Sequence, residues 1–325
     1  MERLALVKIP TTEELREKMR AAAPELTFQF IERGEDYLEY YERAEIAFGS
    51  FQPKKLPYPQ KLKWMQVLSA GVERYIAPGA LPQDAVLTSA SGSYGVTISE
   101  FMLAQTLALY NRLHIYRDNQ NKSLWKPTSY NEQINGKTVL ILGLGNLGLN
   151  YARLMRALGA YTIGVRRSDP SRPAYVDELF FFDDPELESQ FTRADIIAMC
   201  MPGTAQTANT LCAKRIALLK PTAIVINVGR GSAIDEKALA YALKERRIQG
   251  AALDVFQEEP LPETSPLWGL ENALLTPHIA GGDYAPQVLQ TTTALFLENL
   301  AAYRTNSPLK NAVDRSLGYS VGREK

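Results

Sequence analysis

The segment LILGLGNLG, residues 140–148, constrains the fold of this chain more than any other. Three glycines, Gly143, Gly145 and Gly148, have the spacing G-x-G-x-x-G. They follow a run of aliphatic and β-branched residues and precede a helical pattern. In this context the glycines predict a βαβ unit with a tight turn, a backbone open to a pyrophosphate and a helix packed closely on its strand. The amino end of that helix then faces the phosphates of a dinucleotide.

Short apolar runs alternate with helical stretches along the whole chain. The expected strands include 3–9, 62–71, 137–143, 160–165, 195–201, 223–228, 251–256 and 273–279. Such alternation favours open parallel sheets with helices on both faces. We therefore expect an α/β protein with two doubly wound parallel-sheet domains of the Rossmann or flavodoxin type and a cleft between them.

The order of these segments also predicts the domain boundaries. Residues 99–284 should form the dinucleotide-binding domain. Residues 1–98 and 285–325 should form a discontinuous substrate-binding domain, because the helical tail plausibly returns to the first strands. A single long helix is expected over 97–120, with Thr97 and Glu100 at the spacing of a capping box.

The end of the second strand of the βαβ unit bears on the choice of cofactor. NAD-binding sites usually carry Asp or Glu there, which holds the ribose 2′-hydroxyl. This chain has Arg166, Arg167 and Ser168 instead. Two guanidiniums and a hydroxyl suit a 2′-phosphate, so the sequence predicts NADP(H), with NAD(H) possible. The alternative is that both arginines are solvated and Asp169 takes the role of the acid.

Charge and composition exclude several classes of protein. Lys and Arg total 36, as do Asp and Glu, so no basic excess favours nucleic acid as a partner. No window approaches 18 apolar residues, and the charged amino terminus does not look like a secretory signal, so we expect no membrane span and a cytoplasmic location. Two cysteines and two histidines make a disulfide framework or a Cys/His metal site improbable.

Three ionisable residues follow the predicted later strands. Arg230 comes after AIVINV, Glu259 after AALDVF, and His278 near the end of ALLTPHI. Ligands gather at the carboxyl edge of parallel sheets, where an arginine can clamp a carboxylate and a histidine can exchange a proton. Glu259 can orient the imidazole and stabilise its protonated form. The alternatives are a structural ion pair for Arg230, a solvated acid for Glu259 and a structural role for His278.

The glycines on either side of Arg230 suggest how that arginine is presented. Gly229 and Gly231 carry no side chain, which should let the backbone approach a bound molecule. The arginine itself offers a planar fork of donors to an anion. Together with His278 and Glu259, it suits hydride transfer involving a 2-oxo acid.

Four blocks, GLGNLG, NVGRGSAIDEKALAYAL, AALDVFQEEPLP and NALLTPHIAGG, resemble the signatures of the D-isomer-specific 2-hydroxyacid dehydrogenases. The RRS segment makes the chain most similar to the NADP-dependent glyoxylate/hydroxypyruvate reductase branch. The resemblance implies that Arg230 binds substrate and that His278 is the proton donor paired with Glu259. It also implies that Ser69, Ala70 and Gly71 bind the substrate carboxylate through backbone amides, and that Asp254 meets the nicotinamide carboxamide.

The same resemblance implies a cytosolic homodimer, built partly from the long helix and the arm after it, which contains Trp125. We expect the whole dinucleotide site to comprise Gly143, Gly145, Asn146, Leu147, Gly148, Arg166, Arg167, Ser168, Pro202, Thr207, Val228, Gly229, Asp254 and Gly281. No metal is expected.

The predicted activity is the reduction of a 2-oxo acid by NADP(H), or the reverse oxidation of a D-2-hydroxy acid. Two alternatives stay open. One is the oxidation of a phosphite-type anion by the same three residues. The other is a nucleotide-sensing, corepressor-like protein without enzymatic activity, which should carry additional docking surfaces or tails.

Overall fold

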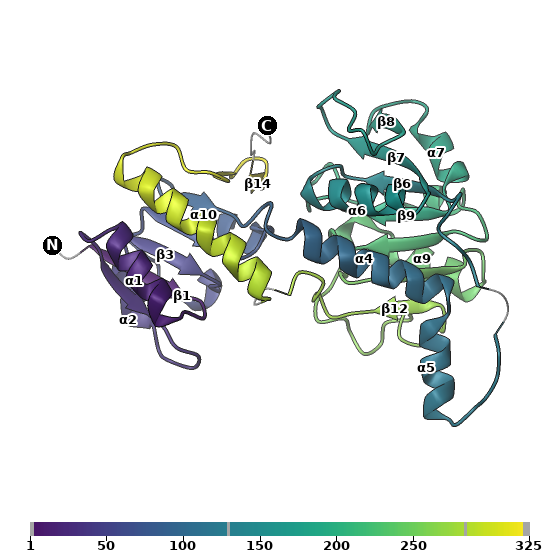
Figure 1. Ribbon diagram of the computed structural model, residues 1–325, viewed down its shortest axis with the longest axis horizontal. Coiled ribbons are helices and arrows are strands. Elements are labelled where there is room, and N and C mark those ends of the chain that lie inside the picture. The colour runs from purple at the N-terminus through teal and green to yellow at the C-terminus, as the bar shows by residue number, and fades with distance from the viewer. Residues whose placement is uncertain (1–2, 129–130, 283–284, 321–325) are drawn as a thin grey trace. The chain divides into compact units, whose positions relative to one another are not determined.

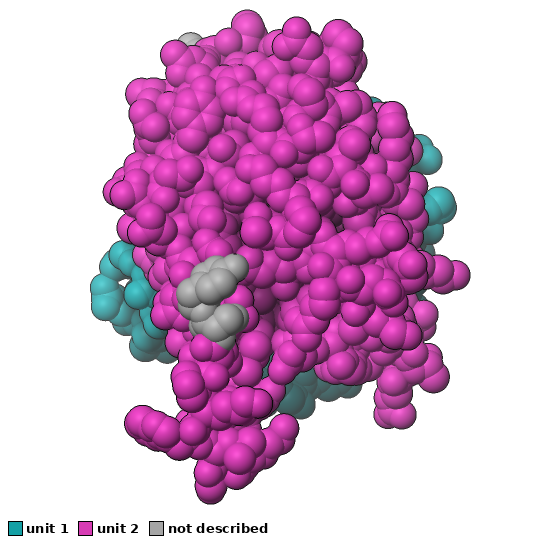
Figure 2. All heavy atoms as spheres, turned by 90° about the vertical axis from the view of Figure 1, so that its right-hand side faces the viewer, with its two compact units in different colours: residues 1–94, 282–325 teal, residues 95–281 magenta. Residues whose placement is uncertain are grey.

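The chain folds into two units. The computed structural model describes residues 3–128, 131–282 and 285–320. Unit 1 comprises Met1–Tyr94 and Gly282–Lys325, and unit 2 comprises Gly95–Gly281 (Figure 2). The predicted boundary between 98 and 99 falls inside the first helix of unit 2. The predicted boundary at 284 lies outside the described residues.

Unit 1 is built on five parallel strands in the order β2-β1-β3-β4-β5 (Figure 1). Their bounds are Leu4–Lys8 for β1, Thr27–Phe30 for β2, Ile46–Gly49 for β3, Trp64–Val67 for β4 and Val86–Thr88 for β5. The sequence prediction omitted β5, which is only three residues long. A small antiparallel pair, β13 (Val313–Asp314) and β14 (Tyr319–Ser320), follows near the carboxyl terminus.

Helices cover both faces of this sheet. One face packs against α1 (Glu13–Ala22) and α10 (Pro286–Arg304), and the other against α2 (Leu38–Arg43) and α3 (Glu73–Ile76). A short 3₁₀ helix, η1 (Pro53–Lys55), follows β3. On α10, the ring of Phe296 stacks on Phe48, with centroids 4.2 Å apart, and the amide of Asn299 donates to Gln66. The carboxyl-terminal helix is thus part of the core formed by the first strands.

Unit 2 is built on seven parallel strands in the order β12-β11-β10-β9-β6-β7-β8. Their bounds are Thr138–Leu142 for β6, Tyr161–Arg166 for β7, Glu178–Phe181 for β8, Ile196–Met199 for β9, Ile224–Asn227 for β10, Gly250–Leu253 for β11 and Ala273–Leu275 for β12. The strand order reverses at β6, so the crevice beside its carboxyl end is the switch point where dinucleotides bind in such sheets.

The two faces of this sheet carry separate cores. Helices α4 (Gly95–Tyr110) and α6 (Asn146–Ala157) pack on one face. Helices α7 (Leu187–Arg193), α8 (Ala213–Ile216) and α9 (Glu236–Lys244) pack on the other. Strands buried on both faces read as continuous apolar runs, which is why the sequence revealed most of these strands. The sequence prediction omitted β8, which lies at the edge of the sheet and is only half-buried. The predicted fold class, with two doubly wound parallel sheets, is confirmed.

The prediction of one long helix over 97–120 is wrong. The helix ends at Tyr110, and α5 (Leu113–Asn121) begins after Arg112, whose φ of 54° is left-handed. One left-handed residue redirects the chain, so the polypeptide cannot continue along the axis of α4. Thr97 is the third residue of α4 and not its cap. Apolar periodicity continues through the break, so the sequence alone does not reveal it.

Among the residues that the structure describes, no helix combines the length and the apolar character that crossing a bilayer requires.

Candidate active site

The predicted catalytic and dinucleotide-binding residues of unit 2 share one edge of its sheet. Each group follows the carboxyl end of a strand. The glycine loop follows β6, Arg166–Ser168 end and follow β7, and the catalytic candidates Arg230, Glu259 and His278 follow β10, β11 and β12. Because β10, β11 and β12 are adjacent and parallel, these three residues emerge at the same edge.

His278 and Glu259 form a direct pair. Nδ1 of His278 lies 2.8 Å from Oε2 of Glu259, and both side chains are partly exposed. The other carboxylate oxygen, Oε1, accepts a hydrogen bond of 3.0 Å from the backbone N–H of Phe256. The carboxylate is therefore held by the chain after β11, and it engages the imidazole through Nδ1 and not through Nε2. Glu258, the neighbouring acid, has no such bond among the described contacts.

A second acid, Glu236, lies near this pair. It accepts a hydrogen bond from the backbone N–H of Gln257, in the same loop as Glu259. Burial, together with the negative charge of Glu259, raises the pKa of Glu236, and the bond from Gln257 partly opposes the rise. Glu236, at the start of α9, thus lies against the loop after β11, but the described contacts pair only Glu259 with the histidine.

Asp254 anchors the segment that carries His278. This carboxylate is 2% exposed. Oδ1 accepts from the hydroxyl of Thr276 at 2.6 Å and from the N–H of Ile279 at 2.9 Å, and Oδ2 accepts from the N–H of Ala280 at 2.9 Å. His278 itself has a left-handed φ of 54°. Because the donors lie on both sides of His278, they hold this uncommon backbone conformation in place. The sequence did not identify Thr276 as a partner of Asp254.

The two glycines beside Arg230 have a different purpose from the one expected. A β-carbon on Gly229 would lie 2.6 Å from the carbonyl oxygen of Met201, and one on Gly231 would lie 1.9 Å from the carbonyl carbon of Phe256. The missing side chains leave room for the protein's own backbone, not for a bound molecule. The glycines let the turn after β10 fit between the ends of β9 and β11.

The turn that carries Arg230 is held by Asn227, a buried polar residue at the end of β10. Its Oδ1 accepts from the N–H of Gly229, and its Nδ2 donates to the carbonyl of Arg230, both at 3.0 Å. The guanidinium of Arg230 donates to the carbonyl of Gly229 at 2.7 Å. The sequence analysis did not single out Asn227, although an amide in an otherwise apolar strand was the available signal. Asp235 caps α9 by accepting a hydrogen bond from the N–H of Ala238.

The glycine loop fits the pyrophosphate of a dinucleotide. Gly143 has a φ of 101°, which suits glycine. A β-carbon on Gly148 would lie 2.0 Å from the carbonyl oxygen of Gly143, so α6 packs tightly on its strand. Around Gly145, by contrast, a β-carbon would meet nothing within 4 Å. The loop is therefore closed toward the protein and open at Gly145, immediately before the backbone amides of Asn146 and Leu147 that begin α6.

Arg166 forms an ion pair with Asp169, the residue that would hold the ribose in the alternative interpretation. Its Nη2 lies 3.0 Å from Oδ2 of Asp169, and its Nη1 donates to the carbonyl of Ser171 at 3.1 Å. The side chain and backbone N–H of Ser171, followed by the charge of Arg166, lower the pKa of Asp169. Arg167 and Ser168 are exposed beside this turn. The end of β7 thus presents two guanidiniums, and that of Arg166 is paired with the carboxylate of Asp169.

The other predicted contact residues occupy loops. Thr207 donates to the carbonyl of Pro202 at 2.6 Å in the loop after β9, Val228 follows β10, and Gly281 follows Ala280 in the turn after β12. Ser69, Ala70 and Gly71 belong to unit 1, in the loop between β4 and α3. There the hydroxyl of Ser69 donates to the carbonyl of Gly71 at 2.6 Å.

Metal and thiol chemistry find little support in the described part of the chain. It contains no cluster of three His, Cys, Asp or Glu side chains that could hold a metal ion. Both cysteines are free. Burial raises the pKa of the Cys200 thiol to about 12, so the thiol stays protonated and is a poor nucleophile.

Known proteins resemble this chain in sequence and in fold. A glyoxylate/hydroxypyruvate reductase B from Pectobacterium carotovorum is 28% identical over 270 residues, which cover 82% of this chain and 83% of the relative. A solved D-isomer-specific 2-hydroxyacid dehydrogenase family protein from Aeromonas salmonicida is 31% identical. It superposes with a TM-score of 0.85, covering 97% of this chain and 100% of that one.

A second solved relative was captured with a nucleotide. A D-isomer-specific 2-hydroxyacid dehydrogenase from Xanthobacter autotrophicus, in complex with NADPH and MES, is 28% identical with a TM-score of 0.78, covering 97% of this chain and 99% of that one. Residues 103–280, more than half of the chain, match the family described as D-isomer specific 2-hydroxyacid dehydrogenase, NAD binding domain. On these grounds the chain belongs to the D-isomer-specific 2-hydroxyacid dehydrogenases, a family of NAD(P)-dependent oxidoreductases.

Proposed function

We propose that this protein reduces a 2-oxo acid to a D-2-hydroxy acid with NADPH. The observation that carries the proposal is the pairing of His278 with Glu259, at the same sheet edge as an open glycine loop. A loop of this kind takes the dinucleotide, and a histidine held by a carboxylate supplies the proton that a carbonyl needs on reduction. The glyoxylate/hydroxypyruvate reductase among the relatives points to a small 2-oxo acid.

The proton passes through His278 in this proposal. Glu259 engages Nδ1, so the protonated imidazole presents Nε2–H to the carbonyl oxygen of the substrate. When bound, the nicotinamide supplies the hydride that adds to the carbonyl carbon. Until it gives up the proton, the imidazole ring carries a positive charge that Glu259 stabilises. The backbone N–H of Phe256 keeps that carboxylate in place.

Arg230 is the proposed clamp for the substrate. Its guanidinium is always charged and can bind a carboxylate with two parallel hydrogen bonds. One donor directed at the carbonyl oxygen would gain strength as negative charge develops there. We further propose that unit 1 is the substrate-binding domain, with the backbone amides of Ser69, Ala70 and Gly71 contributing to carboxylate binding, and that unit 2 binds the dinucleotide. Asp254 is proposed to meet the carboxamide in addition to its structural bonds.

The preference for NADPH rests on Arg166 and Arg167. A charged hydrogen bond to the 2′-phosphate contributes roughly 1.5–3 kcal/mol, so two such contacts give tenfold or larger discrimination. The NADPH-bound relative supports the same choice. Asp169 already pairs with Arg166, and this pairing reduces the net positive charge offered to the phosphate and leaves room for some use of NADH.

The decisive experiment is an NADPH-oxidation screen over glyoxylate, hydroxypyruvate, pyruvate, phenylpyruvate and branched 2-oxo acids, repeated with NADH. At least one 2-oxo acid should be reduced to the D-2-hydroxy acid, with a higher kcat/KM for NADPH than for NADH. The variant Arg166→Ala should lose most of this preference in fluorescence titrations of the two cofactors. The proposed reaction is wrong if no 2-oxo acid is turned over although NADPH binds. An equal or higher kcat/KM with NADH would refute the cofactor preference alone.

We also propose a cytoplasmic homodimer. Large apolar side chains are exposed along α4, α5 and the arm that follows: Val96, Leu107, Leu113, Tyr116, Leu124 and Trp125. A partner subunit would remove this surface from water. The chain has a mass of 36.2 kDa, and light scattering coupled to gel filtration should give twice this mass. The double variant Leu124→Ser/Trp125→Ser should shift the measured mass toward that of the monomer. The two free cysteines agree with a reducing compartment.

A further inference from the structure

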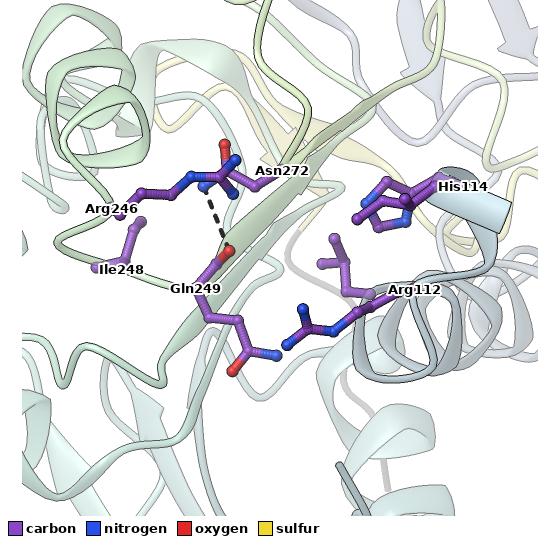
Figure 3. Close-up of a pocket in the computed structure, with 8 residues that line it drawn as sticks. Arg112, His114, Arg246, Ile248, Gln249 and Asn272 are labelled. Atoms are coloured by element: carbon purple, nitrogen blue, oxygen red, sulfur yellow. Dashed lines mark hydrogen bonds between the residues drawn. The ribbon is translucent and has the colours of Figure 1, made fainter. Parts of the chain in front are cut away.

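Unit 2 contains a cavity at the edge of its sheet opposite to the catalytic residues. The cavity measures about 200 Å³ and is lined by residues that include Arg112, His114, Arg246, Gln249 and Asn272 (Figure 3). Gln249 and Asn272 immediately precede β11 and β12. Because the strands are parallel, the cavity lies at their amino ends, whereas Glu259 and His278 follow their carboxyl ends.

The polar atoms of this cavity are incompletely satisfied. Nε of Arg112, Nδ1 of His114 and Nε2 of Gln249 are buried and have no hydrogen-bond partner. They are three of the seven such side-chain atoms among the described residues. Buried polar atoms are nearly always paired, so the gathering of three around one cavity calls for a ligand or ordered water.

All three atoms can donate a hydrogen bond. Arginine Nε and the amide nitrogen of glutamine donate only, and a histidine nitrogen donates in one of its tautomers. The side chains of Arg112 and Gln249 point toward one another across the cavity (Figure 3). Two donors that face each other need an acceptor between them, so the missing group is one that accepts several hydrogen bonds.

The charges of the side chains that line the cavity indicate whether the ligand is an anion or a cation. Arg112 and Arg246 are both cationic, and only Arg246 has an acidic partner among the described ion pairs, Glu271 at 2.7 Å. A cation would leave these donors without an acceptor, and so would an apolar ligand. We propose that the cavity binds a small oxyanion with a phosphate or carboxylate group. The volume of about 200 Å³ suits inorganic phosphate or a small carboxylic acid and is too small for a dinucleotide.

The backbone is built to hold these donors. Arg112 and Arg246 have left-handed φ values of 54° and 52°, which are uncommon for residues other than glycine and recur at functional sites. Asn272 donates to the carbonyl of Leu243 and to that of Gln249, and so fixes the segment between α9 and β11. The bond to Gln249 is the dashed line in Figure 3. Anion binding in this cavity does not depend on the proposed reaction, so the proposal holds whether or not the protein reduces a 2-oxo acid.

Isothermal titration of the full chain with inorganic phosphate, at saturating NADPH, tests the site. The wild type should bind phosphate saturably, and Arg112→Gln should weaken this binding about tenfold or more, because it loses a charged, forked donor. The matched control is Arg247→Gln. Arg247 neighbours Arg246 in sequence but is exposed and lies over the ring of Tyr241, so the substitution should leave phosphate binding unchanged.

Gln249→Leu is the second variant, and it keeps the test decisive if Arg112→Gln fails to fold. It removes one unpartnered donor without altering charge and should also weaken phosphate binding. The proposal is overturned if the wild type binds no phosphate saturably, because water would then satisfy the donors. It is also overturned if Arg112→Gln and Gln249→Leu, both folded by circular dichroism, bind phosphate as well as Arg247→Gln does. Titration with succinate in place of phosphate distinguishes a carboxylate ligand from a phosphate ligand.

Discussion

Nδ1 of His278 and Oε2 of Glu259, from the loops after two adjacent strands, lie 2.8 Å apart. This contact ties the imidazole to a carboxylate that the backbone of Phe256 holds in turn. In the proposed mechanism this contact gives Glu259 the role of a positioning residue, which acts through the histidine and not on the substrate.

The first prediction separates these two roles by kinetics. His278→Ala should lower kcat by about 10²–10⁴-fold, the usual range for a general acid. Glu259→Gln should lower kcat by less, and the double variant should be no slower than His278→Ala alone, since Glu259 acts only through the ring. Glu258→Gln is the matched control and should keep wild-type kinetics. Additive losses in the double variant would show that Glu259 has an independent role.

The second prediction concerns Arg230. Lysine keeps the charge but loses the planar fork, so Arg230→Lys should raise KM for the oxo acid and lower kcat, and Arg230→Ala should do both more severely. The affinity for NADPH, measured by fluorescence titration, should hardly change in either variant. The assignment fails if Arg230→Ala weakens NADPH binding tenfold and leaves KM for the oxo acid unaltered, because the arginine would then be a cofactor ligand.

The third prediction compares two glycines with opposite surroundings. Gly231→Ala should destabilise the fold by about 3 kcal/mol or more, since the new methyl group would overlap the backbone of Phe256. Gly145→Ala should leave the melting temperature nearly unchanged, because nothing lies within 4 Å of its β-carbon. It should instead weaken NADPH binding. Thermal unfolding and cofactor titration of both variants check this contrast, which the reverse pattern would contradict.

The fourth prediction tests the anchoring of the histidine loop by Asp254. Asp254→Asn places an amide N–H among three donors and should cost about 1–3 kcal/mol of stability, with a lower kcat. Thr276→Val removes only the 2.6 Å bond to Oδ1 and does not alter the carboxylate, so it should show a smaller loss of the same kind with unchanged NADPH affinity. Wild-type stability and kcat in Thr276→Val would argue against the anchoring role.

The fifth prediction is a dependence of stability on pH that arises from His114. Burial lowers the pKa of this imidazole below its usual 6.5, and the backbone carbonyl of Ala108, followed by the charges of Asp118 and Glu271, only partly opposes the shift. The unfolded chain therefore takes up the proton more readily, so stability should fall as pH drops below about 6.5 toward the lowered pKa. His114→Gln cannot titrate and should lose less stability over that range. Calorimetric melting in phosphate-free buffers from pH 8 to 5 measures the difference, and parallel curves would exclude His114 as the cause.

The sequence determined the architecture and the inventory of the candidate site. Runs such as AIVINV are apolar except for Asn227 because parallel strands are buried on both faces, so local composition was enough to reveal them. The positions of Arg230, Glu259 and His278 also followed, since residues after adjacent parallel strands emerge at one edge. The dinucleotide loop could be predicted because its glycines are required by the local backbone conformation, as the positive φ of Gly143 shows.

Only the tertiary structure decided how these residues are held. The break at Arg112 interrupts a continuous apolar pattern, and Gly229 and Gly231 are needed because of backbone that is distant in sequence, at Met201 and Phe256. Thr276 contacts Asp254 although the two residues are more than 20 positions apart along the chain. Arg112 and Gln249 line one cavity although they are still farther apart in the sequence. Propensity and periodicity describe a residue's neighbours along the chain, whereas hydrogen-bond partners and close contacts depend on which segments the fold brings together.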